Sequence, residues 1–176
     1  MKKIALFLAV SMSGELQQVQ YKPANSGSSV QFKIKNMGFN VSGRFTGLDG
    51  NIAFDPARPT EASFDVSIDA NTINTDNETR DNHLRGDSYF DVQRFPRIRF
   101  QSAKVTPSSK KNVYFLFGRL TIKGQAKDIS FPFSVAASGT GYLFTGSFNI
   151  NRKDFGVGGT SIISDNLEVS LSVLAR

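Results

Sequence analysis

Hydrophobic and polar residues alternate with a period of two along most of the chain after Gln18. In one segment, Phe64, Val66 and Ile68 alternate with serine and aspartate residues. Successive side chains of a β-strand point to opposite faces, so this pattern predicts strands with one apolar and one solvated face. The alternation marks five segments: 30–35, 63–69, 97–101, 128–135 and 167–173.

A sixth segment, residues 113–122, is apolar on both faces. Phe115 and Phe117 fall on one face, whereas Tyr114 and Leu116 fall on the other. A strand of this kind is expected to be covered on its outer side as well, by a helix or by a partner subunit.

Short turn signals separate the segments. They include Asp55-Pro56, Lys123-Gly124, and the stretches 47–50, 107–109 and 138–141. Many strands joined by tight turns indicate an all-β sandwich or an up-and-down antiparallel barrel.

Two features interrupt the strand pattern. Pro132 lacks a backbone N–H, so its strand is predicted to be bulged or to lie at a sheet edge. Thr75 and Glu78 have the spacing of a capping box, with Thr75 at the N-cap, and Gly86 is placed as a C-terminal stop. These signals predict one short helix between strands.

Phenylalanine is abundant, with 16 residues, and most of those in predicted strands fall in the apolar phase. Two arrangements fit this pattern. The rings could fill a solid aromatic core, or they could line an apolar tunnel that holds a lipid. The period of two does not distinguish them. The phenylalanines assigned to strands are Phe32, Phe45, Phe54, Phe64, Phe100, Phe115, Phe117, Phe131, Phe133, Phe144 and Phe148.

Cysteine is absent and histidine occurs once, as His83. The composition therefore excludes disulfides, thiolate chemistry and a multi-histidine zinc site, and we expect no metal and no required cofactor. The remaining catalytic hypothesis pairs His83 with Asp81 or Asp87 as a general base. The spacing of His83 and Asp87 is equally that of a charge pair at a helix end, and no G-x-S-x-G nucleophile motif is present.

The formal net charge is +6. Basic residues such as Lys33, Lys35, Arg97 and Arg99 occupy outward strand positions and are not interleaved with exposed aromatic residues. This distribution argues against nucleic-acid binding. It suits attraction to anionic lipid head groups.

Residues 1–14 have the features of a signal peptide. Met1-Lys2-Lys3 is basic, residues 4–10 form an apolar run, and Ser11 and Ser13 suit a cleavage site. The run is much shorter than the roughly 20 residues that cross a bilayer; the alternative is an unusual first strand. We predict Sec-dependent export to the periplasm or beyond, with residues 19–176 as one domain.

A set of short motifs, in order along the chain, resembles the YceI family of exported, lipocalin-like lipid-binding proteins. The most specific is Asn77-x-x-Arg80-Asp81-x-His83-Leu84-Arg85. One position departs from the family, which often has a histidine where this chain has Asn36. The other motifs lie at residues 28–32, 35–39, 43–45, 49–55, 89–91, 95–96, 100–102, 118–124, 151–156 and 164–165.

The resemblance implies an extended eight-stranded antiparallel barrel, closed by the helix. Such a barrel would hold a polyprenyl lipid or an isoprenoid quinone for transport or storage, with a possible link to stress. It also implies a homodimer and suits transient contact with a membrane or membrane protein. The competing hypothesis is a secreted stress or interaction protein with a solid core and no lipid.

Two groups of site residues follow. Arg80, His83 and Asp154 are candidates for the head-group end, although each could instead be structural, because Arg–Asp pairs commonly hold loops. The predicted lipid-binding wall comprises Phe32, Ile34, Met37, Phe39, Phe45, Phe64, Ile68, Leu84, Phe90, Phe100, Phe115, Phe131, Phe133, Phe148 and Phe155.

Overall fold

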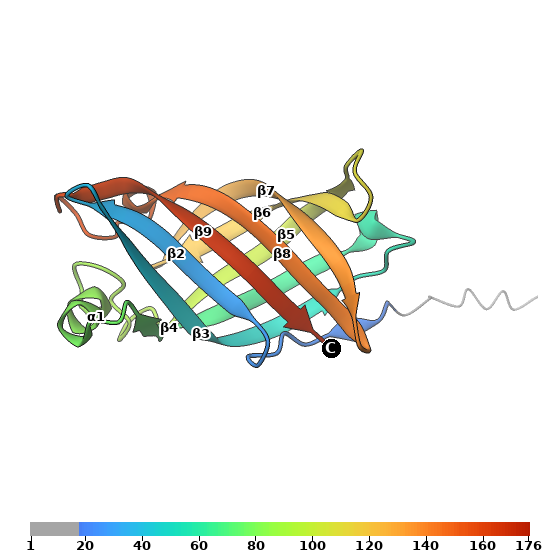
Figure 1. Ribbon diagram of the computed structural model, residues 1–176, viewed down its shortest axis with the longest axis horizontal. Coiled ribbons are helices and arrows are strands. Elements are labelled where there is room, and N and C mark those ends of the chain that lie inside the picture. Colours follow the sequence, from blue (N-terminus) through green and yellow to red (C-terminus); the bar gives the residue numbers. More distant parts are fainter. Residues whose placement is uncertain (1–17) are drawn as a thin grey trace, which may run out of the picture.

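The alternating segments form long antiparallel strands that close into a barrel (Figure 1). A computed structural model describes residues 18–176, so the predicted signal peptide lies outside the described residues. The strands are β1 (Gln20–Tyr21), β2 (Ser29–Asn36), β3 (Phe39–Ala53), β4 (Ser63–Asn74), β5 (Arg97–Pro107), β6 (Val113–Ile122), β7 (Gln125–Ser138), β8 (Gly141–Asn151) and β9 (Ile163–Ala175). Between them lie the α-helix α1 (Glu78–Arg85) and the 3-10 helices η1 (Pro59–Glu61) and η2 (Arg152–Phe155).

Eight of these strands make the closed barrel predicted from the sequence. They follow the order β3-β2-β9-β8-β7-β6-β5-β4, and a β3–β4 pairing completes the ring. The short β1 is an extra strand beside the end of β3. In the part of the chain that the structure describes, closure leaves no long unpaired edge, which suits a fold made mostly of β-strands. Within residues 18–176, no helix is both long and apolar enough to cross a membrane.

The barrel has two different ends (Figure 1). The helix end carries α1, the β2–β3 turn and the β8–β9 connection with η2. The far end carries the C-terminus, the β7–β8 turn and the connection that contains η1. The barrel interior also differs between the two ends: a cavity opens at the helix end, whereas packed aromatic side chains lie toward the far end.

The predicted helix is present, and Gly86 caps its C-terminus as expected. The predicted N-cap was wrong by two residues: the cap is Asn77, whose side chain accepts a hydrogen bond from the Arg80 amide at 2.9 Å. Thr75 is buried instead, and its hydroxyl and amide both donate to the Asp81 carboxylate. The Thr75 hydroxyl is therefore occupied within the protein and unavailable to the helix terminus.

Pro132 lies in β7, a strand with neighbours on both sides. The pairing of β7 with β6 runs through Pro132, but the pairing with β8 ends at Phe133 and Gly146. The missing N–H of Pro132 thus coincides with the end of one ladder, so Pro132 occupies a locally unpaired edge.

One predicted wall residue, Phe115, points outward and was assigned to the wrong face. The cross-strand partners Leu116 and Phe131 are both buried, as are Tyr114 and Phe133, so these pairs define the inner face of β6. Phe115 lies between them in sequence and is 42% exposed. The helix does not cover this outer face, since it lies at the end of the barrel (Figure 1).

Candidate functional site

A large cavity occupies the barrel interior, with a volume of about 480 Å³. Its wall receives side chains from all eight strands of the ring and from α1. At the helix end it reaches the surface, where exposed Met37 and Ile162 border it. The volume lies within the range of pockets that hold small apolar ligands.

All but two of the predicted wall residues line this cavity. Besides Phe115, the exception is Phe39, which is 77% exposed at the start of β3 and contributes to the outer rim rather than to the wall. The predicted residues that line the cavity are Phe32, Ile34, Met37, Phe45, Phe64, Ile68, Leu84, Phe90, Phe100, Phe131, Phe133, Phe148 and Phe155.

Aliphatic residues of β9 form a part of the wall that the sequence reasoning left out. They are Leu167, Val169, Leu171 and Val173, spaced by two. Their alternation with polar residues was the signal that could have identified them, because the apolar face of a barrel strand points inward. The wall is therefore mixed, with rigid rings and branched aliphatic side chains together.

The cavity stops short of the far end. Phe133 and Phe144 lie on its lining, whereas the fully buried Phe54 lies behind them, with its ring centroid 5.5 Å from that of Phe144. Phe54 packs edge to face against Tyr114 and Tyr142, and none of these three rings lines the cavity. The tunnel and the solid core that the sequence left as alternatives thus both occur, in different parts of one barrel.

Arg80 lines the mouth of the cavity but is also held by the protein. Its Nε donates to the Thr75 hydroxyl at 2.7 Å, and its Nη2 donates to the Thr75 carbonyl at 2.8 Å. The Thr75 hydroxyl in turn donates to buried Asp81. This network holds the Arg80 guanidinium at the mouth of the cavity. Arg80 therefore has a structural role, and a contact with a head group would be additional to it.

His83 lies beside Arg80 on α1 and also lines the mouth. Its ring packs edge to face against Tyr89, with centroids 5.1 Å apart. The two aspartates of the general-base hypothesis are bonded elsewhere: Asp81 accepts from Thr75, and Asp87 accepts from Ser88. Among the described residues, no aspartate forms a hydrogen bond or ion pair with His83.

Asp154, the third head-group candidate, does not line the cavity, and its placement at the mouth was wrong. It is exposed on η2, whereas its neighbours Arg152 and Phe155 are buried. The tight turn of a 3-10 helix rotates adjacent residues to different sides, and here the arginine and the phenylalanine face the protein.

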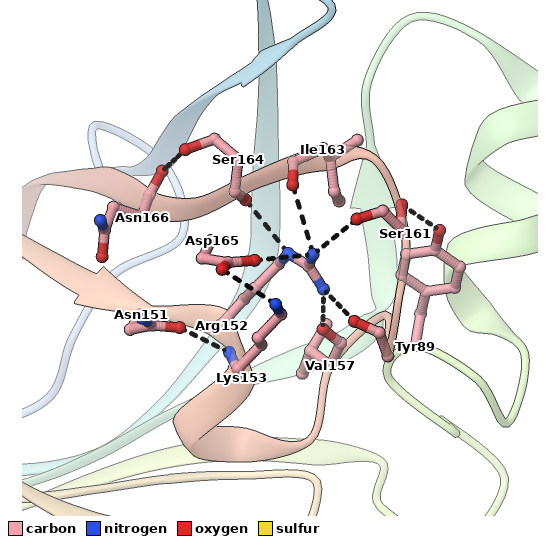
Figure 2. Close-up of polar contacts among 11 residues, drawn as sticks. Tyr89, Asn151, Arg152, Lys153, Val157, Ser161, Ile163, Ser164, Asp165 and Asn166 are labelled. Atoms are coloured by element: carbon pink, nitrogen blue, oxygen red, sulfur yellow. Dashed lines mark hydrogen bonds and ion pairs between the residues drawn. The ribbon is translucent and has the colours of Figure 1, made fainter.

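The importance of Arg152 was not predicted from the sequence: its side chain is only 4% exposed. Figure 2 shows the polar contacts of its guanidinium. Its guanidinium donates to the carbonyl oxygens of Val157, Ser161 and Ser164 at 2.7–3.1 Å and to the Asp165 carboxylate at 3.0 Å. These bonds organise the β8–β9 connection, which forms one side of the mouth. An arginine in a loop motif gave no sign of this burial.

Asn36 supplies unused hydrogen-bonding capacity at the mouth. It lines the cavity at the end of β2, and its Oδ1 is buried with no hydrogen-bond partner among residues 18–176. A buried acceptor of this kind is costly unless something binds it. The mouth of the cavity therefore carries a polar acceptor that a bound head group could use.

The sequence matches the family model described as "YceI-like domain" over residues 21–175. A UPF0312 protein of Yersinia pestis (strain Pestoides F) is 32% identical over 156 residues, which covers 82% of this chain and 79% of the relative. The match to the family model extends over the whole barrel, including the strands and loops that form the cavity.

Solved structures share the fold. BcnA of Burkholderia cenocepacia superposes with a TM-score of 0.81 at 28% identity, covering 88% of this chain and 99% of BcnA. A polyisoprenoid binding domain from Saccharophagus degradans, implicated in plant cell wall breakdown, superposes with a TM-score of 0.74 at 15% identity, covering 89% and 97%. On the extent of the sequence match, this chain belongs to the YceI-like domain family.

Proposed function

We propose that the protein binds a long-chain isoprenoid-type lipid, a polyprenyl compound or an isoprenoid quinone, in the barrel cavity. The observation that carries this proposal is the cavity itself: about 480 Å³, walled by apolar side chains and reaching the surface at one end. Burial contributes about 0.8 kcal/mol for each methylene, so a tail of ten or more carbons would offset a typical cost of association. The apolar wall needs no ion or cofactor to bind such a tail.

The polar groups at the mouth favour a single orientation of the ligand. Arg80, His83 and Asn36 all lie at the helix end, so the head group would sit there with the tail directed inward. The free Oδ1 of Asn36 would accept a hydrogen bond from a head group such as the hydroxyl of a prenyl alcohol.

The comparison with the domain from Saccharophagus degradans supports the class of ligand. That domain is described as polyisoprenoid binding. At 15% identity, the structural similarity indicates a shared fold. The apolar cavity of this chain is a separate reason to expect a similar ligand. A protein with a solid core and a purely protein partner would have no use for such a cavity.

Binding rather than catalysis is the activity that the site favours. His83 packs on Tyr89 and has no carboxylate partner among the described residues. The predicted export would place the protein in the periplasm, where it would carry or store the lipid.

An apolar rim at the mouth supports transient contact with a membrane. Met37, Phe39 and Ile162 are 75%, 77% and 78% exposed, and pairing through Asn36 brings the β2–β3 turn next to the start of β9. We propose that these side chains enter the bilayer surface, so that a lipid passes into the cavity without crossing water.

The predicted homodimer remains a proposal. Phe115 and Phe117 are 42% and 39% exposed on the outer face of β6, and Pro132 lies directly opposite Phe115. This apolar strip would suit the same strip on a second copy. Light scattering of the protein and of Phe115→Ser/Phe117→Ser tests it, since the double variant should be monomeric.

Ligand titration tests the proposed function. The delipidated protein should enhance the fluorescence of N-phenyl-1-naphthylamine, and geranylgeraniol or a short-chain ubiquinone should displace the probe at about one molecule per cavity. A water-soluble diol serves as the control and should not compete. If neither lipid displaces the probe, the proposal is wrong.

A further inference from the structure

The inner end of the cavity is a layer of three aromatic rings. Phe64 of β4, Phe133 of β7 and Phe144 of β8 all line the cavity and are buried. The Phe64 ring packs edge to face against Phe133 and Phe144, with centroids 5.6 and 5.4 Å apart. We call these three residues the aromatic floor.

A second aromatic layer supports the floor from behind. Phe54 packs edge to face against Phe144, Tyr114 and Tyr142, with centroids 5.3–5.6 Å apart. Neither Phe54 nor the two tyrosines line the cavity. Since protein interiors are close-packed, the floor cannot recede toward the far end unless this second layer moves.

We infer that the aromatic floor, held in place by Phe54, sets the longest lipid tail that the cavity accepts. The inference rests on the proposed function and adds a limit on tail length to it. While a tail still has room, each buried methylene tightens binding about fourfold. Once the tail reaches the floor, further carbons remain at the mouth and add little. Affinity should therefore rise with tail length and then level off.

Two substitutions should move that limit in opposite directions. Phe144→Ala removes a ring and should lengthen the accepted tail by about one isoprene unit. Val173→Phe should shorten it, because Val173 lines the cavity and pairs across strands with Phe144. Phe115→Ala is the matched control, since it removes the same ring from the outer face.

The test measures dissociation constants for linear prenyl alcohols of increasing length by displacement of N-phenyl-1-naphthylamine. Far-ultraviolet circular dichroism checks that each variant is folded, and Phe144→Leu replaces Phe144→Ala if the latter is not. The inference predicts a plateau for the wild type, a later plateau for the Phe144 variant, an earlier one for Val173→Phe and no change for Phe115→Ala.

The possible failures are distinguishable. If the wild type binds the alcohols but its affinity rises through every tail length, the inference is wrong and the proposed function stands. The same conclusion follows if the folded Phe144 and Val173 variants show the same plateau as the wild type. A wild type that binds none of the alcohols overturns the proposed function as well.

Discussion

The Nη2 of Arg152 lies 3.0 Å from the Oδ1 of Asp165, across the connection between β8 and β9 (Figure 2). The arginine is buried, whereas the aspartate is half-buried and also contacts Lys153 at 2.9 Å. Several backbone carbonyls accept from the same guanidinium. One side chain thus organises a loop that borders the cavity mouth.

Arg152→Lys should lower the free energy of unfolding by about 2–4 kcal/mol, because lysine cannot reproduce the fork of donors and leaves buried carbonyls unpaired. Urea unfolding measures the change. Lys153→Ala is the matched control, since Lys153 is half-exposed and its ion pair with the same aspartate should contribute less than about 1 kcal/mol. Equal losses in the two variants would contradict the assigned role of Arg152.

Phe131→Asp or Phe100→Asp should abolish lipid loading and lower the free energy of unfolding by several kcal/mol. Both rings line the cavity, and an unpaired carboxylate there would be buried in an apolar wall. Probe titration and urea unfolding measure the two effects. Phe115→Asp places the same group on the outer face and should retain loading; retention of loading by Phe131→Asp would argue against the cavity as the site.

Replacing the apolar rim should slow lipid uptake more than it weakens binding at equilibrium, since Met37 and Ile162 lie at the outer edge of the cavity. Met37→Ser/Ile162→Ser is expected to reduce the rate of transfer from anionic vesicles by about tenfold, because less apolar surface enters the bilayer. Stopped-flow transfer of a fluorescent lipid measures the rate. Val19→Ser is the control, because Val19 is exposed beside β1 at the far end. If the transfer rate of the double variant equals that of the wild type, the rim takes no part in lipid uptake.

The Asp65–Arg99 pair between β4 and β5 should make a small, acid-sensitive contribution to stability. The hydrogen bond from Arg99, at 2.6 Å from the Asp65 carboxylate, lowers the pKa of that carboxyl below its usual value. A lowered folded pKa stabilises the protein above the unfolded pKa of about 4, and the contribution disappears as the pH falls through the folded pKa.

Asp65→Asn should therefore cost less than about 1 kcal/mol at pH 7, since both side chains are about half-exposed. The difference from the wild type should shrink below about pH 4. Urea unfolding at a series of pH values checks both statements. If the difference in the free energy of unfolding instead grows as the pH falls, the stabilising role assigned to the ion pair is contradicted.

The strands were predictable because each segment alternates strongly and the turns between them are explicit. The face of Phe115 was not assigned correctly, since residues 113–122 are apolar in both phases and only the pairing with β7 identifies the inner one. The N-cap of α1 was displaced for a different reason: the Thr75 hydroxyl bonds to Asp81, a contact that local capping patterns do not anticipate.

The cavity could be anticipated only in part. Alternation tells which residues point inward, but the free volume depends on barrel diameter and on how rings from different strands meet. Phe64, Phe133 and Phe144 were all identified as apolar strand residues, yet their joint position at the cavity's end required the three-dimensional arrangement. Burial of Arg152 likewise depends on a loop that folds back around it.

Mass spectrometry of an organic extract of the purified protein tests the central claim most directly. The protein is purified without detergent from cells that express it, and Phe131→Asp is purified in parallel. We predict that an isoprenoid-type amphiphile copurifies with the wild type at about one molecule per cavity and is absent from the variant. Recovery of no amphiphile from the wild type, together with failure of the delipidated protein to take up prenyl alcohols or quinones, would contradict the claim.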